Sequence, residues 1–178
     1  MKQLLPLFFL FVAMNLSAQD VYYTRGATLH LNGELNGQPL QLKTNKLIIR
    51  LDYETATAIM RLRVSDLHCE VDSLQQLLRR SPVEFVYEAK LSLDYISTEK
   101  HPPMEFTLEG WLSHNGLKTW VSGDGELHFN ANAAEYTNLM GLTFRLNLRA
   151  LGIEPPVPGL AEDFEAVVVQ ALLQKDKN

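Results

Sequence analysis

The sequence is poor in the residues that many functional sites require. Its 178 residues include a single cysteine, Cys69, which can form no internal disulfide and makes no zinc site alone. Basic residues number 16 against 21 acidic ones, and the formal net charge is −5. Nucleic-acid-binding domains usually carry a basic surplus, so we expect no nucleic-acid partner.

Motifs of the common enzyme classes are also absent. The chain has no HExxH pair for zinc, no GxSxG turn for a serine nucleophile, and neither the GxGxxG nor the GxxxxGK[ST] loop for phosphates. No close helical spacing relates the five histidines, which we place on the surface or in turns: His30, His68, His101, His114 and His128. We therefore predict that the protein is not an enzyme and holds no metal or cofactor.

Long apolar runs are confined to the first twenty residues. Met1-Lys2 precedes an almost unbroken apolar run from Leu4 to Met14, and small residues follow up to Ala18. This is the layout of a secretory signal peptide, because an apolar core of about eleven residues is well short of the roughly 20 that cross a bilayer. We predict a signal peptide over residues 1–18, export to the periplasm or the medium, and one mature domain over residues 19–178 that spans no membrane.

Apolar and polar residues alternate along much of the mature chain. Over residues 83–95 the odd positions are apolar and the even ones mostly polar, which predicts a half-buried strand. The same pattern predicts strands at 27–31, 39–43, 46–53, 57–65, 105–109, 117–121, 125–130 and 142–148. Turn signals lie between them: Asn32-Gly33, Asn36-Gly37, Asn115-Gly116 and Ser122-Gly123-Asp124-Gly125. Many short strands joined by regular turns favour an all-β sandwich or an up-and-down barrel.

Two segments depart from this pattern. Apolar residues recur at helical spacing from Val71 to Leu78, and Pro82 stops the run, so we expect one short helix over residues 71–80. The segment from Leu160 to Leu172 also fits a helical template, although its valine-rich stretch at 166–169 favours a strand. From the residues alone the helix is slightly preferred at the C-terminus.

The interior of such a barrel is either filled by side chains or holds one small ligand. Leucines and aromatic residues on the inward parities are compatible with both: Phe85, Tyr87, Tyr95, Phe106 and Phe144. The small residues Ala89 and Gly110 on the same parity favour some free space. The opposite parity carries charges such as Glu88 and Arg145, which excludes a transmembrane barrel because its outer face must be apolar.

A set of short motifs runs through the middle of the chain. Pro82-Val83-Glu84-Phe85 opens a long strand, and Gly110, Leu112 and Gly116 follow in a G-x-L-x-x-x-G arrangement. This order resembles the YceI-like family, in which a Pro-x-x-Phe strand leads to such a hairpin. The stretch from Phe144 to Leu148 is similar to that family's penultimate strand, and the resemblance spans nearly all of residues 21–174.

The resemblance implies an extended antiparallel, lipocalin-like β-barrel of about eight strands with one short helix. In it, residues 163–174 form the strand that closes the barrel, which we adopt over the helix because closure removes an exposed sheet edge. It also implies a polyisoprenoid or another long-chain lipid, such as a quinone or a fatty acyl chain, held inside. The expected lining residues are Phe85, Tyr87, Leu91, Leu93, Leu108, Leu112, Phe144, Leu146 and Leu148.

Two hypotheses from different classes remain. The leading one is an exported, periplasmic protein that holds a long apolar lipid in its interior, with the question of a homodimer left open. The alternative is a structural or interaction β domain with a filled core that acts through surface residues such as Trp120, Ile48 and Val86.

Overall fold

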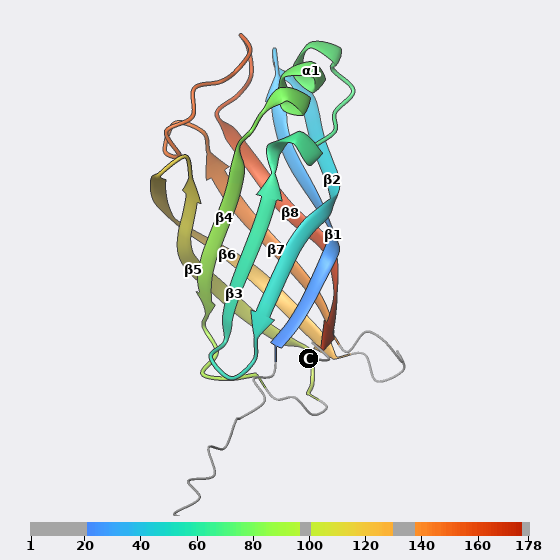
Figure 1. Ribbon diagram of the computed structural model, residues 1–178, viewed down its shortest axis with the longest axis vertical. Helices are drawn as coiled ribbons and strands as arrows, with labels where there is room; N and C mark the ends of the chain where they lie inside the picture. The colour runs from blue at the N-terminus through green and yellow to red at the C-terminus, as the bar shows by residue number, and fades with distance from the viewer. Residues whose placement is uncertain (1–20, 97–100, 130–137, 176–178) are drawn as a thin grey trace, which may run out of the picture.

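Eight antiparallel strands close into a barrel in the computed structural model, which describes residues 21–96, 101–129 and 138–175 (Figure 1). Each strand pairs with the next in sequence, and the last pairs with the first. The strands are β1 (Val21–Leu35), β2 (Gln38–Asp52), β3 (Thr57–Arg63), β4 (Glu84–Leu91), β5 (Met104–His114), β6 (Leu117–Phe129), β7 (Asn138–Asn147) and β8 (Asp163–Lys175). The predicted all-β, lipocalin-like antiparallel barrel is confirmed.

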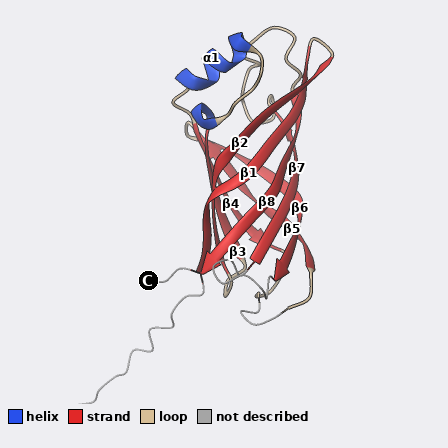
Figure 2. Cartoon of the chain, turned by 90° about the vertical axis from the view of Figure 1, so that its right-hand side faces the viewer, coloured by secondary structure: helices blue, strands red, loops and turns tan. Residues whose placement is uncertain are grey.

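Two helical segments interrupt the strands between β3 and β4. A single 3-10 turn, η1 (Val64–Asp66), precedes the helix α1 (Asp72–Arg80), which confirms the short helix expected over residues 71–80. Figure 2 shows α1 lying across one end of the barrel. In the described part of the chain, no helix is both long enough and apolar enough to cross a membrane.

Two of the four predicted turns are tight hairpins. Asn36-Gly37 joins β1 to β2, and Asn115-Gly116 joins β5 to β6. All four residues have positive φ angles, 52° and 73° in the first turn and 45° and 81° in the second. Two-residue hairpins of this type need positive φ at both central positions, which explains the Asn-Gly pairs.

The other two predicted turns are wrong, because both lie within strands. Gly33 belongs to β1, and Gly125, in the stretch predicted as a turn at 122–125, belongs to β6. A Cβ on Gly33 would lie 2.5 Å from Cε1 of Phe164, and one on Gly125 would lie 2.6 Å from Cζ of Phe106. These glycines therefore leave room for aromatic rings inside the barrel.

The C-terminal segment is the strand β8, which closes the barrel, so the strand adopted for residues 163–174 is confirmed and the slight preference of the residues alone for a helix is wrong. Its buried side chains alternate from Phe164 to Val168 and resume at Ala171, one residue late. The pairings of β8 with both neighbours shift register at this point. A step of three residues between buried side chains is also what a helix produces, which is why the sequence pattern was ambiguous.

The strand predicted over 83–95 ends early, at Leu91. Tyr95, which was expected to face inward, is 70% exposed. The next residue, Ile96, is buried instead, and its backbone N–H donates a hydrogen bond to the carbonyl oxygen of Tyr53 at 2.9 Å. The chain leaves the sheet after β4, so the alternation of the sequence no longer predicts which side chains face inward.

Side chains fill one end of the barrel completely. This end, which we call the floor, lies where β1 begins and β8 ends, opposite α1. The side chains of the floor are at most 2% exposed: Tyr22, Ile49, Leu51, Tyr53, Leu91, Leu108, Leu127, Met140 and Leu173.

One buried polar atom of the floor has no partner. The hydroxyl of Tyr53 makes no hydrogen bond with any described residue, while its ring stacks on that of Tyr22 with centroids 4.1 Å apart. Burial, and secondly Tyr22, raises the pKa of Tyr53 well above its ordinary value, so the hydroxyl stays neutral. We expect Tyr53→Phe to raise the free energy of unfolding by about 1 kcal/mol, because it removes an unsatisfied buried group and keeps the ring.

Urea unfolding measures this change, and Tyr87→Phe is the matched control. The hydroxyl of Tyr87 donates a hydrogen bond to the carbonyl oxygen of Val121 at 2.8 Å, so its removal should lower stability by about 1 kcal/mol. Loss of stability in both variants would show that the Tyr53 hydroxyl is satisfied.

Candidate ligand-binding cavity

The half of the barrel next to α1 is hollow. Its cavity has a volume of about 570 Å³, within the roughly 300–1,000 Å³ typical of ligand pockets. All eight strands contribute to the wall through the ends that point toward α1, for example through Leu31, Leu42, Leu62, Phe85, Leu112, Val121, Phe144 and Ala166. The interior is therefore filled at the floor and open at the opposite end.

The apolar face of α1 covers part of this opening. Leu74 and Leu78 point into the cavity and pack with Leu67 in an apolar cluster at this end of the barrel. Gln75 fixes the segment before the helix, since its side chain accepts a hydrogen bond from the Cys69 N–H at 2.8 Å and donates one to the Leu67 carbonyl at 3.3 Å. Cys69 is half-buried and unpaired.

The long connection from β7 to β8 forms the opposite side of the opening, and it is held firmly to the β1–β2 hairpin. The Ala161 N–H donates to the Glu34 carbonyl at 2.9 Å, and the Asn36 N–H donates to the Gly159 carbonyl at 2.8 Å. An ion pair between Arg149 and Glu162 ties the two ends of the connection together. This side of the opening is thus a fixed part of the wall.

Polar side chains of the cavity gather at its opening, which we call the rim. Ser81, at the end of α1, lies on the helix side, while His114, Asn115 and Glu154 lie on the side of the β5–β6 hairpin and the β7–β8 connection. Asn115 and Glu154 are exposed, so the cavity reaches the protein surface there.

The deep wall holds one polar side chain, and its donor is already used. The hydroxyl of Tyr87 lies 2.8 Å from the carbonyl oxygen of Val121 and 3.2 Å from that of Leu108, so its proton is shared between two acceptors. Burial, and secondly Glu109, raises the pKa of Tyr87 far above its ordinary value, which keeps the hydroxyl protonated. The ring meets that of Phe144 edge-on at 5.4 Å. The deep cavity therefore presents an apolar surface to an occupant.

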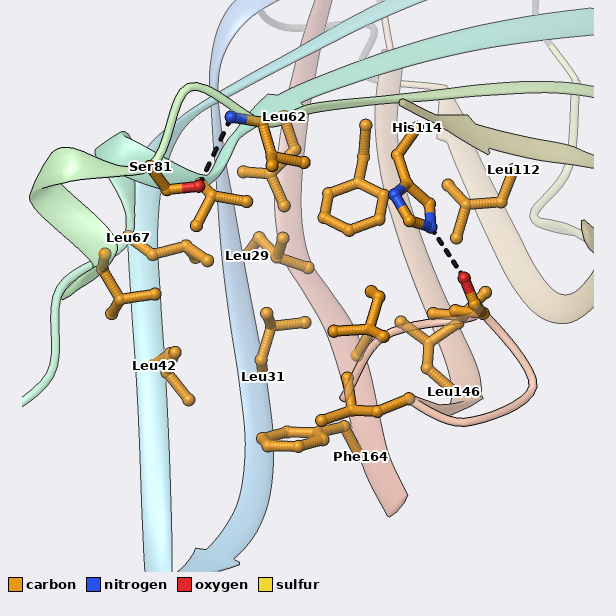
Figure 3. A pocket seen from close by; sticks show the side chains of 18 of the residues that line it. Leu29, Leu31, Leu42, Leu62, Leu67, Ser81, Leu112, His114, Leu146 and Phe164 are labelled. Atoms are coloured by element: carbon orange, nitrogen blue, oxygen red, sulfur yellow. Dashed lines mark hydrogen bonds between the residues drawn. The ribbon is translucent and has the colours of Figure 1, made fainter. Parts of the chain in front are cut away.

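His114 was expected on the surface or in a turn, and that prediction is wrong. Its side chain is 7% exposed, lines the cavity, and lies 4.9 Å from the ring of Phe85 between centroids. Its Nε2 is 2.7 Å from the carbonyl oxygen of Leu151 (Figure 3). The signal was present in the sequence, because His114 continues the inward parity of Gly110 and Leu112 along β5.

The structure brings six of the nine predicted lining residues to the cavity and leaves three elsewhere. Leu91 and Leu108 belong to the floor, and Leu93 packs against the floor from outside the strands. The residues on the cavity wall are Phe85, Tyr87, Leu112, Phe144, Leu146 and Leu148. The alternation of the sequence predicts which side chains of a strand face inward. It does not predict which part of the strand borders the cavity and which part borders the floor. Sequence reasoning also missed the contributions of β1–β3, of α1 and of Phe164.

The small residues Ala89 and Gly110 do not create free space, contrary to expectation. Ala89 is buried in the core cluster, opposite Gly110 in the pairing of β4 with β5. A Cβ on Gly110 would overlap the carbonyl oxygen of Glu88. Glycine at this position permits close approach of the two strands.

The surface residues of the alternative hypothesis are only partly as expected. Trp120 and Ile48 are exposed, whereas Val86 is half-buried. Trp120 lies against Trp111 of the neighbouring strand, edge-on, with centroids 5.1 Å apart. Within the described ranges, no group of three His, Cys, Asp or Glu side chains is placed to hold a metal ion.

Comparison with known proteins identifies the fold but no family. No family model matches the chain, and no curated protein matches it in sequence. Among solved structures, a polyisoprenoid binding domain from Saccharophagus degradans implicated in plant cell wall breakdown is similar in structure, with a TM-score of 0.63. The match covers 89% of this chain and 99% of that domain at 7% sequence identity. At this identity, the similarity shows that the two share a fold.

Proposed function

We propose that the protein binds one long-chain apolar molecule, such as an isoprenoid, a quinone tail or a fatty acyl chain, in the cavity next to α1. The observation that carries this proposal is the cavity of about 570 Å³, whose deep wall is apolar apart from the Tyr87 hydroxyl, already hydrogen-bonded to the backbone, and whose other polar residues lie at the rim. Burial of hydrocarbon stabilises a complex by about 0.8 kcal/mol per CH₂. A chain of fifteen carbons thus gains roughly 12 kcal/mol before ordering costs of several kcal/mol.

Two further points support this function. The solved domain with the same fold is described as binding polyisoprenoids. In addition, the interior is divided into a solid floor and a hollow upper half, so the hollow is not simply a loosely packed core. We also propose export to the periplasm or the medium, which the signal-peptide layout of residues 1–18 supports.

Native mass spectrometry of protein purified from a bacterial periplasm without detergent tests both the binding of a lipid and the removal of the signal peptide. We expect a reproducible added mass that extracts into organic solvent, or uptake of a C15–C20 isoprenoid after delipidation. The polypeptide mass should correspond to a chain that begins at Gln19. A bare mass together with no uptake of isoprenoids or fatty acids would overturn the binding proposal and favour an interaction domain, and a retained leader would overturn cleavage after Ala18.

A further inference from the structure

The hydrogen bond of His114 identifies Nε2 as a donor and therefore sets the tautomer of the neutral ring. A carbonyl oxygen carries no hydrogen, so Nε2 must be the donor in its contact with Leu151 at 2.7 Å. A neutral imidazole has one N–H, and therefore Nδ1 carries a lone pair that can accept a hydrogen bond. Figure 3 shows Nε2 turned toward the β7–β8 connection and Nδ1 on the cavity side of the ring.

This acceptor has no protein partner. Among the described residues, the side chain of His114 makes a single hydrogen bond, to Leu151, which leaves Nδ1 without a protein partner in a side chain that is 7% exposed. The Tyr53 hydroxyl is the one fully buried side-chain polar atom of the described residues without a partner, so Nδ1 of His114 is accessible from the cavity, where an occupant can supply a donor. Phe85 and Leu151 hold the ring in place, so the acceptor is pre-positioned before an occupant arrives.

The charges around the cavity also favour a neutral head group that donates a hydrogen bond. The described lining includes no lysine or arginine, and its one carboxylate, Glu154, lies at the rim. A carboxylate or phosphate head group would find no counter-ion there, would meet the lone pair of Nδ1, and would be repelled by Glu154. A neutral head group that donates a hydrogen bond fits all three conditions.

We propose that Nδ1 of His114 selects long-chain alcohols, whose terminal hydroxyl donates to it, over acids and ethers of the same chain. This inference rests on the proposed function and names the ligand class of the same cavity. The hydroxyl lies at the rim and the hydrocarbon chain extends from there toward Tyr87 and Phe144 in the deep wall. His114 is in this sense a specificity-determining residue.

Three probes with one C15 chain test the proposal: farnesol, farnesyl methyl ether and farnesoic acid. Their affinities for the full protein are measured by competition with a fluorescent long-chain alcohol. We expect farnesol to bind about tenfold more tightly than the ether, which lacks the donor, and to bind at least tenfold more tightly than the acid. Equal affinity of farnesol and the ether would overturn the assignment while leaving the proposed function intact. Failure of all three probes to bind would instead overturn both.

Variants of His114 assign the preference to Nδ1. His114→Phe removes the acceptor and should equalise the alcohol and the ether, whereas His114→Asn places an amide oxygen near the position of Nδ1 and should retain the preference. His30→Phe, the same change at a histidine of β1 that does not line the cavity, is the matched control and should behave as the original protein. A preference for farnesol that persists in His114→Phe would overturn the proposal. If that variant does not fold, the comparison of the three probes on the unmodified protein still tests whether the cavity prefers the alcohol.

Discussion

Replacing Leu112 by tryptophan is expected to weaken binding of a C15 isoprenoid by more than about a hundredfold while leaving the barrel folded. Leu112 projects from β5 into the cavity beside His114 (Figure 3). The larger side chain would displace roughly four methylene groups of a ligand, and at about 0.8 kcal/mol for each this amounts to about 3 kcal/mol. Because the indole enters open space, little overpacking of the core accompanies the change.

Thr107→Trp is the control for this experiment. Thr107 lies on the same strand but is exposed on the outer face, so the variant adds the same indole outside the cavity. Isoprenoid titrations monitored by fluorescence should show normal binding for Thr107→Trp and none in the accessible range for Leu112→Trp. Unchanged affinity in a folded Leu112→Trp variant would place the ligand elsewhere on the protein.

Truncation of Leu108 to alanine should lower the free energy of unfolding by about 2–5 kcal/mol. Leu108 is fully buried in the floor, and its removal leaves a void that the surrounding side chains can close only in part. Leu112→Ala, four residues along the same strand and on the same face, should cost less than about 1.5 kcal/mol, because that side chain borders space that is already empty.

Comparison of Leu108→Ala with Leu112→Ala tests whether the interior is divided into a filled floor and a hollow upper half. Denaturant unfolding gives both values, and far-UV circular dichroism checks that the sheet is intact. Losses of equal size at the two positions would mean that the upper half is packed like the floor, in which case a filled-core interaction domain becomes the better account.

The architecture could be predicted from the sequence because the signal for a strand is local. Alternation placed nearly all strands, and the Asn-Gly pairs marked both hairpins that use a two-residue turn. Gly33 and Gly125 misled the turn prediction, since glycine also serves where an aromatic ring from a distant strand needs room. That reason lies in tertiary packing, which adjacent residues in the sequence do not report.

The site could be predicted only in part. Parity correctly placed Phe85, Phe144 and Leu146 inside the barrel, but it placed Leu108 there equally well. Whether an inward side chain meets another side chain or empty space depends on all eight strands and on α1 together. The importance of His114 depends in turn on Leu151, which approaches it from the β7–β8 connection, 37 residues away.

The solid floor has a consequence for how a bound chain could travel. The side chains of the floor are packed in the core at one end of the described barrel, whereas the cavity reaches the surface at the rim, next to α1. We therefore expect a molecule in the cavity to enter and leave through the opening next to α1, with its polar end entering last and leaving first. A ligand bound as we propose would exchange through the α1 end alone, and its hydrocarbon chain would stay in the cavity until its polar end has left.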